Sequence, residues 1–109
     1  MGVVLAPIPN DKVAEWKAWM TELTGPRRAD LEDFNRRHGL TKHEAWFCET
    51  PMGAAVIAIH EGPGAAEFMP KVAVSSHAFD VEFRSKLQSV HGMDLSKPPP
   101  GPMPVKVLG

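Results

Sequence analysis

The fold class that this sequence predicts is α+β, with an antiparallel sheet that helices cover on one face. Residues 42–61 contain two apolar runs joined by Pro51-Met52-Gly53, which is typical of a β-hairpin. On either side of it, apolar residues recur at helical spacing over residues 13–23 and 79–90. A hairpin flanked by amphipathic helices therefore sets the expected architecture.

The chain is expected to open with a strand and an amphipathic helix. Residues 3–8 are apolar and are followed by Pro9, so they predict a strand that stops there. Asn10 or Asp11 is expected to cap a helix, because a short side-chain oxygen accepts the free amide protons of the first turn. The helix presents one apolar stripe, made of Val13, Trp16, Trp19, Met20 and Leu23.

A kink or a one-turn break is expected at Gly25-Pro26, since proline is tolerated in the first turn of a new helix. The apolar stripe resumes at Leu31, Phe34 and His38. Gly39 is expected to close this second helical segment in the left-handed conformation.

The hairpin register follows from the turn. If residues 51–52 are its centre, His43 lies opposite His60 and Trp46 lies opposite Ile57. One face of the hairpin then carries His43, Ala45, Phe47, Val56, Ala58 and His60, and the other carries Glu44, Trp46, Cys48, Ala55, Ile57, Ile59 and Glu61. Both faces are mostly apolar, so both need a cover.

The segment after the hairpin is expected to hold one short and one long helix. Gly62-Pro63-Gly64 ends the hairpin, and residues 65–69 predict a short helical turn that Pro70 limits. A longer helix is expected to start at Ser75 or Ser76 and to stop at Gly92. Its apolar stripe consists of Phe79, Phe83, Leu87 and Val90.

The C-terminal residues complete the predicted order of elements. Residues 96–104 form a proline-rich arm that should be extended, and residues 105–108 are expected to form a last edge strand. The resulting order is the βαββαβ order of a ferredoxin-like sandwich, and all of residues 1–109 are expected to form one domain. Because the helices cover one face only, we expect the other apolar face to pair with a second copy of the chain as a homodimer.

Composition excludes several classes of protein. The chain has 12 Lys and Arg against 13 Asp and Glu, with no basic cluster beyond two arginine pairs, which argues against nucleic-acid binding. The single cysteine, Cys48, excludes an internal disulfide and, in an apolar strand, favours a reduced, cytoplasmic protein. No apolar run approaches the length of a membrane span, and the opening residues lack the pattern of a signal peptide.

Three short segments carry a resemblance to a known superfamily. They are the Trp-rich first helix with Arg27-Arg28, the run Ser-Ser-His-Ala-Phe-Asp at 75–80, and the run His-Gly-Met-Asp-Leu at 91–95. They resemble a group of small, uncharacterised bacterial proteins in the dimeric α+β barrel superfamily. The resemblance implies ferredoxin-like protomers packed sheet against sheet. That superfamily includes cofactor-free oxygenases, isomerases, polyketide cyclases, ligand binders and haem proteins, so the resemblance implies no single reaction.

The first of two function hypotheses is a small-molecule enzyme without an obligatory cofactor or metal. An apolar pocket between sheet and helices would be lined by Trp16, Trp46, Phe47, Phe79 and Phe83. A histidine, together with Glu44 or Glu61, would move protons on a small hydrophobic substrate, in a proton transfer, isomerisation, cyclisation or oxygenation. Arg27 is a further candidate, because its guanidinium could hold a carboxylate.

The histidine candidates are His43, His60 and His77. Neighbouring imidazoles at His43 and His60 would repel each other when charged, so that one pKa would fall and a neutral base would be available. The alternative is that both lie in solvent at the open end of the hairpin.

The second hypothesis is a non-catalytic ligand-binding or assembly module, in which the same interior is simply core. A lower alternative is haem binding or degradation, because in haem-degrading relatives the axial histidine comes from the helix that corresponds to the one His77 opens. Asn10 and Trp46 match two further haem-site residues by type and order. The simpler expectation for His77 and Asn10 is that they cap helices.

Overall fold

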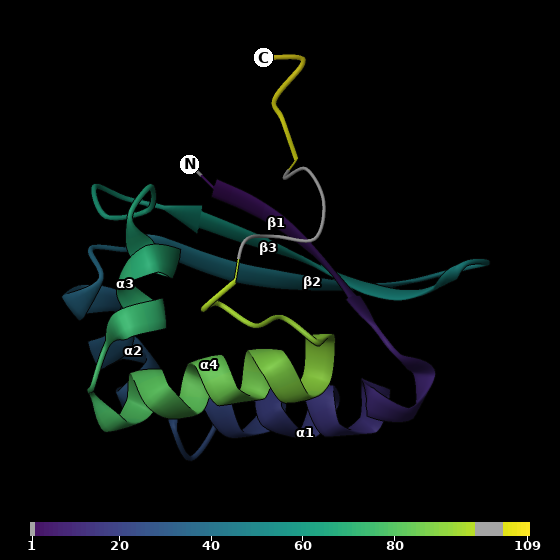
Figure 1. The fold of residues 1–109 in the computed structure, drawn as a ribbon, viewed down its shortest axis with the longest axis horizontal. Coiled ribbons are helices and arrows are strands. Elements are labelled where there is room, and N and C mark those ends of the chain that lie inside the picture. Colours follow the sequence, from purple (N-terminus) through teal and green to yellow (C-terminus); the bar gives the residue numbers. More distant parts are fainter. Residues whose placement is uncertain (1, 98–103) are drawn as a thin grey trace.

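The computed structural model describes residues 2–97 and 104–109 and shows a mixed α+β fold (Figure 1). Its elements are β1 (Gly2–Ile8), a 3-10 turn η1 (Asn10–Lys12), α1 (Val13–Thr24), α2 (Arg28–Arg37), β2 (Lys42–Thr50), β3 (Gly53–Glu61), α3 (Phe68–Val74) and α4 (Ala78–His91). The three strands form an antiparallel sheet in the order β1-β3-β2. In Figure 1, α1 and α4 lie side by side below this sheet, and α2 and α3 lie toward one end of it.

The predicted hairpin register is confirmed. Trp46 pairs with Ile57 and His43 pairs with His60 along the β2–β3 ladder. Because side chains alternate along a strand, this register points Val56 and His60 toward the helices, where each is 4 % exposed. On the opposite, outer face, Trp46 is 61 % exposed.

The core lies between the inner face of the sheet and the helices. Phe34 of α2 is fully buried at its centre, and its ring centroid lies 4.7 Å from that of Phe83 and 5.7 Å from that of Phe68. The first helix contributes Trp16, Trp19 and Leu23, and β1 contributes Val4, Ala6 and Ile8. The sequence-derived apolar stripes of α1 and α4 thus face this core.

Most helix boundaries lie at the glycine and proline residues that predicted them. The break at Gly25-Pro26 separates α1 from α2, and Gly39 and Gly92 take positive φ angles of 66° and 68° after α2 and α4. These are left-handed conformations that glycine adopts at little cost. The predicted caps at Asn10 and Asp11 are not formed, since both residues lie in η1 and no side-chain hydrogen bond caps α1.

The third helix is longer than predicted. The sequence suggested a turn over residues 65–69 ending at Pro70, but α3 extends through Pro70 to Val74. Proline is accommodated because it occupies the first turn of α3, where the backbone amide has no partner within the helix. The last helix begins after His77 rather than at Ser75 or Ser76.

The predicted last strand at 105–108 is not formed. Val105, Val107 and Leu108 are 78 %, 93 % and 91 % exposed, and the chain end projects away from the sheet (Figure 1). An apolar pattern favours a strand only where a neighbouring edge pairs with it, and no described residue does so here. Most of the predicted arm at 96–104 lies outside the described residues.

Candidate functional site

An apolar cavity of about 290 Å³ lies between the inner face of the sheet and helices α1, α3 and α4. Trp16 and Trp19 of α1 and Phe83 of α4 form part of its wall, and His43 and His60 project into it from the hairpin. Ala45, on the inner face of β2, lines the cavity and is exposed, so the cavity opens to solvent over this strand. A space of this size, with few polar groups, resembles a small-molecule pocket.

His43 has one ring nitrogen fixed by a neighbour. Its Nδ1 lies 2.8 Å from Oδ1 of Asn35 in α2. An amide oxygen only accepts hydrogen bonds, so Nδ1 of His43 carries the proton and donates it. In the neutral ring, Nε2 of His43 is then left with a free lone pair.

His60 has no such partner. Its side chain is 4 % exposed, and its ring lies 4.8 Å from the His43 ring and 4.6 Å from the Phe68 ring, measured between centroids. Within the part of the chain that the structure describes, no hydrogen bond reaches the His60 ring. Among the described residues, the fully buried side-chain nitrogen or oxygen without a hydrogen-bond partner is Nδ1 of His38, so the ring nitrogens of His60 stay accessible to water or to a molecule that occupies the cavity.

Both imidazoles of this pair are neutral at pH 7. Burial lowers the pKa of His43 to about 4, and repulsion from a charged His60 adds to the shift. Burial likewise lowers the pKa of His60 to about 4. The pair therefore offers hydrogen-bond donors and acceptors without carrying charge into the apolar cavity.

The remaining predicted wall residues divide between the cavity, the core and the outer face. Trp16 and Phe83 line the cavity. Phe47 stacks on Trp16 with 5.4 Å between ring centroids, and Phe79 is buried against Phe34, but neither borders the cavity. Trp46 lies on the outer face of the sheet because its position alternates with those of the inward-facing residues.

The structure separates the predicted acids from the histidines. Glu44 and Glu61 share the outer face with Trp46, so the sheet itself lies between them and the cavity. Glu44 accepts a 3.4 Å hydrogen bond from the Trp46 indole, and Glu61 pairs with Lys42 at 3.3 Å. The expected pairing of a pocket histidine with one of these carboxylates is therefore not formed within this chain.

Arg27 also lies outside the cavity. Its guanidinium forms ion pairs with Asp30, at 3.2 Å, and with Glu82 of α4, and it lies over the Phe79 ring. Since two carboxylates already neutralise it at the surface, Arg27 has the environment of a helix-to-helix contact.

His77 caps α4, as the simpler expectation has it. Its Nδ1 accepts a hydrogen bond of 3.2 Å from the backbone amide of Phe79, and the side chain is exposed. His77 does not border the cavity, and Trp46 is on the opposite side of the sheet. These residues do not fit a haem held by His77.

Sequence reasoning missed the residue that holds His43 in place and one residue that lines the cavity. Asn35, the hydrogen-bond partner of His43, lies four residues after Leu31 on α2, so helical spacing was a usable signal for it. His91, at the end of α4, lines the cavity, and its Nδ1 lies 3.2 Å from the carbonyl oxygen of Pro7. Its position at a helix end gave no comparable signal.

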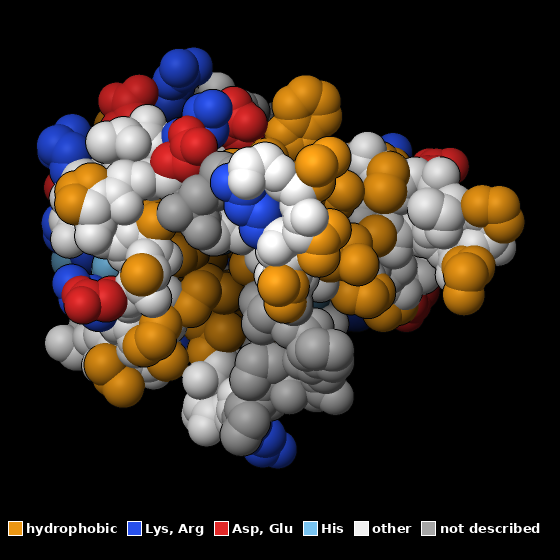
Figure 2. Space-filling model, turned by 90° about the horizontal axis from the view of Figure 1, so that it is seen from above, with side chains coloured by type: hydrophobic (Ala, Val, Ile, Leu, Met, Phe, Trp, Pro, Cys, Tyr) orange, Lys and Arg blue, Asp and Glu red, His pale blue; other side chains and the backbone are white. Residues whose placement is uncertain are grey.

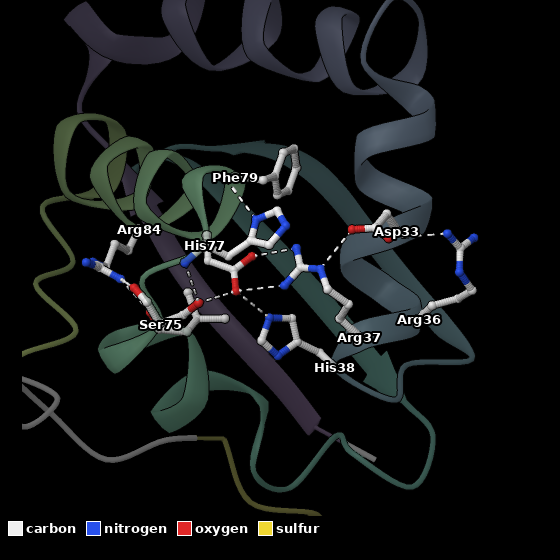
Figure 3. A network of polar contacts seen from close by, with 10 residues as sticks. Asp33, Arg36, Arg37, His38, Ser75, His77, Phe79 and Arg84 are labelled. Atoms are coloured by element: carbon white, nitrogen blue, oxygen red, sulfur yellow. Dashed lines mark hydrogen bonds and ion pairs between the residues drawn. The ribbon is translucent and has the colours of Figure 1, made fainter.

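A second polar cluster, away from the cavity, surrounds the fully buried Asp80 (Figure 3). Its carboxylate accepts two hydrogen bonds from Arg37, at 2.9 and 3.1 Å, one of 2.9 Å from His38 and one of 2.7 Å from Ser75. Burial alone would raise the pKa of Asp80, but these hydrogen bonds outweigh it and hold the pKa below its usual range. The cluster ties α4 to the end of α2 and has the character of a structural anchor.

The described residues contain no group of three or more His, Cys, Asp or Glu side chains placed to bind a metal ion. None of the helices in residues 2–97 and 104–109 has the length and apolar character needed to cross a membrane.

Comparisons with protein-family models, curated proteins and solved structures found no match to this chain.

Proposed function

We propose that this protein is a small-molecule enzyme of the dimeric α+β barrel type that transfers a proton on a small hydrophobic substrate without a cofactor. The observation that carries the proposal is the ring of His60, which is buried, has no hydrogen-bond partner among residues 2–97 and 104–109, and borders an apolar cavity. A substrate hydroxyl or carbonyl would supply the missing hydrogen bond.

His43 is the proton acceptor in this proposal. Its Nδ1–H is held by Asn35, which leaves the Nε2 lone pair for a substrate proton. A pKa of about 4 makes the resting imidazole a weak base. Negative charge developing on a bound substrate would stabilise the imidazolium and raise its pKa during proton transfer. Isomerisation, cyclisation and oxygenation of hydrophobic carbon acids or phenols can all begin with such a step.

The dimer is supported by the outer face of the sheet. Leu5, Trp46 and Ile57 lie together there, with Leu5 56 % exposed and Trp46 61 % exposed. Figure 2 shows hydrophobic side chains gathered toward the hairpin end of the molecule when it is viewed from above. An apolar sheet face on which Leu5 and Trp46 are exposed fits a second copy of the same face, as in a ferredoxin-like protomer packed sheet against sheet.

A non-catalytic ligand-binding module is the second candidate. The low pKa of both imidazoles favours it, because a weak base is better suited to accepting a hydrogen bond than to removing a proton. The cavity and the neutral donors and acceptors serve either function equally well.

Proton exchange distinguishes the two. The protein is incubated in D₂O with a panel of small hydrophobic ketones and phenols, and ¹H NMR follows the loss of exchangeable C–H signals. The proposal predicts exchange that the wild type accelerates and that His43→Gln and His60→Gln each slow at least tenfold. His77→Gln is the control, since His77 is exposed and lies outside the cavity.

Compounds that bind without accelerated exchange would establish the binding module in place of the enzyme. A panel that neither binds nor exchanges would contradict both.

A further inference from the structure

The cavity has a second polar end. His43 and His60 occupy one end of it, and His91, from the C-terminus of α4, also borders it. His60 is the strand-pairing partner of Gly2 in β1, whereas His91 contacts β1 at Pro7. Five residues of strand, at about 3.3 Å each, separate these contacts by roughly 16 Å. The residues that line the cavity therefore extend along β1, from the His43 and His60 pair past Val4 and Ala6 to His91.

The hydrogen bond to Pro7 determines what His91 can offer. A backbone carbonyl only accepts, so Nδ1 of His91 carries the proton and donates it at 3.2 Å. Burial lowers the pKa of His91, and the bond to Pro7 offsets only part of this effect, so the ring is neutral at pH 7. Its Nε2 is then a hydrogen-bond acceptor. The His43 ring is in the same state, with Nδ1 used by Asn35 and Nε2 free to accept.

The space between the two ends is apolar. Val4 and Ala6 of β1, Trp16 of α1 and Leu87 of α4 form part of its wall. None of the described residues around the cavity is a Lys, Arg, Asp or Glu. Such a wall gives no counterion to a carboxylate or a phosphate, and burying either without one would be costly. The volume of about 290 Å³ corresponds to about ten water molecules at roughly 30 Å³ each.

We propose that the cavity takes an elongated, uncharged hydrophobic molecule with a hydroxyl group at each end. One hydroxyl donates to Nε2 of His43 beside His60, and the other donates to Nε2 of His91. This inference rests on the proposed function and specifies its substrate class, because two acceptor nitrogens at opposite ends select for two donors at a fixed spacing.

A matched set of alcohols tests the spacing. Isothermal titration calorimetry compares decane-1,10-diol, decan-1-ol and butan-1-ol on the wild-type protein and on His91→Phe. The wild type is expected to bind the diol about tenfold more tightly than decan-1-ol, which corresponds to one additional hydrogen bond in a buried site. In His91→Phe this preference should fall to about one, while decan-1-ol keeps its affinity. His91→Gln, which retains an acceptor oxygen, should restore part of the preference.

Because His91→Phe also loses the hydrogen bond to Pro7, a second variant that keeps this bond tests the site independently. Ala6→Leu fills the cavity near its His91 end, so it should weaken decane-1,10-diol at least tenfold and leave butan-1-ol unchanged at the His60 end. Equal affinity of the wild type for diol and decan-1-ol, or an unchanged preference in His91→Phe, would overturn the two-ended site but not the proposed function. Failure of all three alcohols to bind the wild type would count against both.

Discussion

The rings of His43 and His60 lie 4.8 Å apart between centroids, at an interplanar angle of 51°, at the end of the β2–β3 ladder where the cavity begins. This relationship follows directly from the hairpin register, because paired residues point to the same face of the sheet. Two neighbouring imidazoles in an apolar setting resist protonation, and the consequences can be measured.

Stability should decrease in mild acid. The folded-state pKa values of His43 and His60 are about 4, below the value of about 6.5 expected in the unfolded chain, so the unfolded state binds more protons between these pH values. The contribution of these two groups to the free energy of unfolding is complete above pH 6.5 and is lost as the pH falls toward 4. We expect a loss on the order of 3 kcal/mol for each of the two rings between pH 7 and pH 4, measured by urea unfolding.

The double variant His43→Gln/His60→Gln should flatten this pH dependence. Part of the pH dependence of the unfolding free energy should remain, because burial also lowers the pKa of His91. An unchanged slope in the double variant would show that these two rings are not the groups responsible.

Filling the cavity should block binding without unfolding the protein. Ala58 lines the cavity on the inner face of β3, and Ala55, on the same strand, points to the outer face. Ala58→Leu is expected to weaken decan-1-ol at least tenfold by calorimetry, with a change in unfolding free energy below about 1 kcal/mol. Ala55→Leu is the matched control and should bind normally. Equal affinities in the two variants would place the ligand elsewhere.

The Asp80 cluster should be important for stability. Asp80→Asn removes the charge that compensates Arg37, and breaking a buried ion pair typically costs about 3–5 kcal/mol. Glu82→Gln is the control, because Glu82 lies on the same helix and pairs with Arg27 at the surface, where the loss should stay below about 1 kcal/mol. Thermal and urea unfolding provide the comparison, and similar losses in both variants would refute the anchor role.

Dimerisation through the outer face can be tested at Trp46. Trp46→Glu places a charge in the centre of the proposed interface and should convert the dimer to a monomer in sedimentation equilibrium. Since Trp46 is 61 % exposed in the protomer, its folding should be little affected. Met52→Glu is the control, because Met52 is exposed in the hairpin turn beyond the strands. A wild type that sediments as a monomer would remove the dimer from the proposal.

The hairpin could be predicted because its information is local. A two-residue turn and alternating side chains fix the pairing of His43 with His60 and assign Trp46 to the opposite face. The same alternation already separated Glu44 and Glu61 from the histidines. The sheet that lies between the two faces keeps these acids out of the pocket that the histidines border.

Other features depend on contacts between distant parts of the chain. Asp80 forms its hydrogen bonds with Arg37, which lies 43 residues away in the sequence. No local sequence pattern predicts that a charged residue in the first turn of an amphipathic helix will be fully buried. His91 reaches Pro7 across 84 residues. The apolar residues at 105–108 have the composition of a strand, but a strand also requires an edge to pair with.

The most direct test of the cavity and its imidazole pair is a long-range ¹H–¹⁵N spectrum of the histidine rings at pH 7, recorded with and without decan-1-ol. Neutral rings are expected for His43 and His60, with the proton of His43 on Nδ1, and the ¹⁵N signals of His60 should shift when the alcohol is added while those of His77 stay unchanged. Protonated rings at this pH, or His60 nitrogens that do not respond to a saturating alcohol, would contradict this expectation.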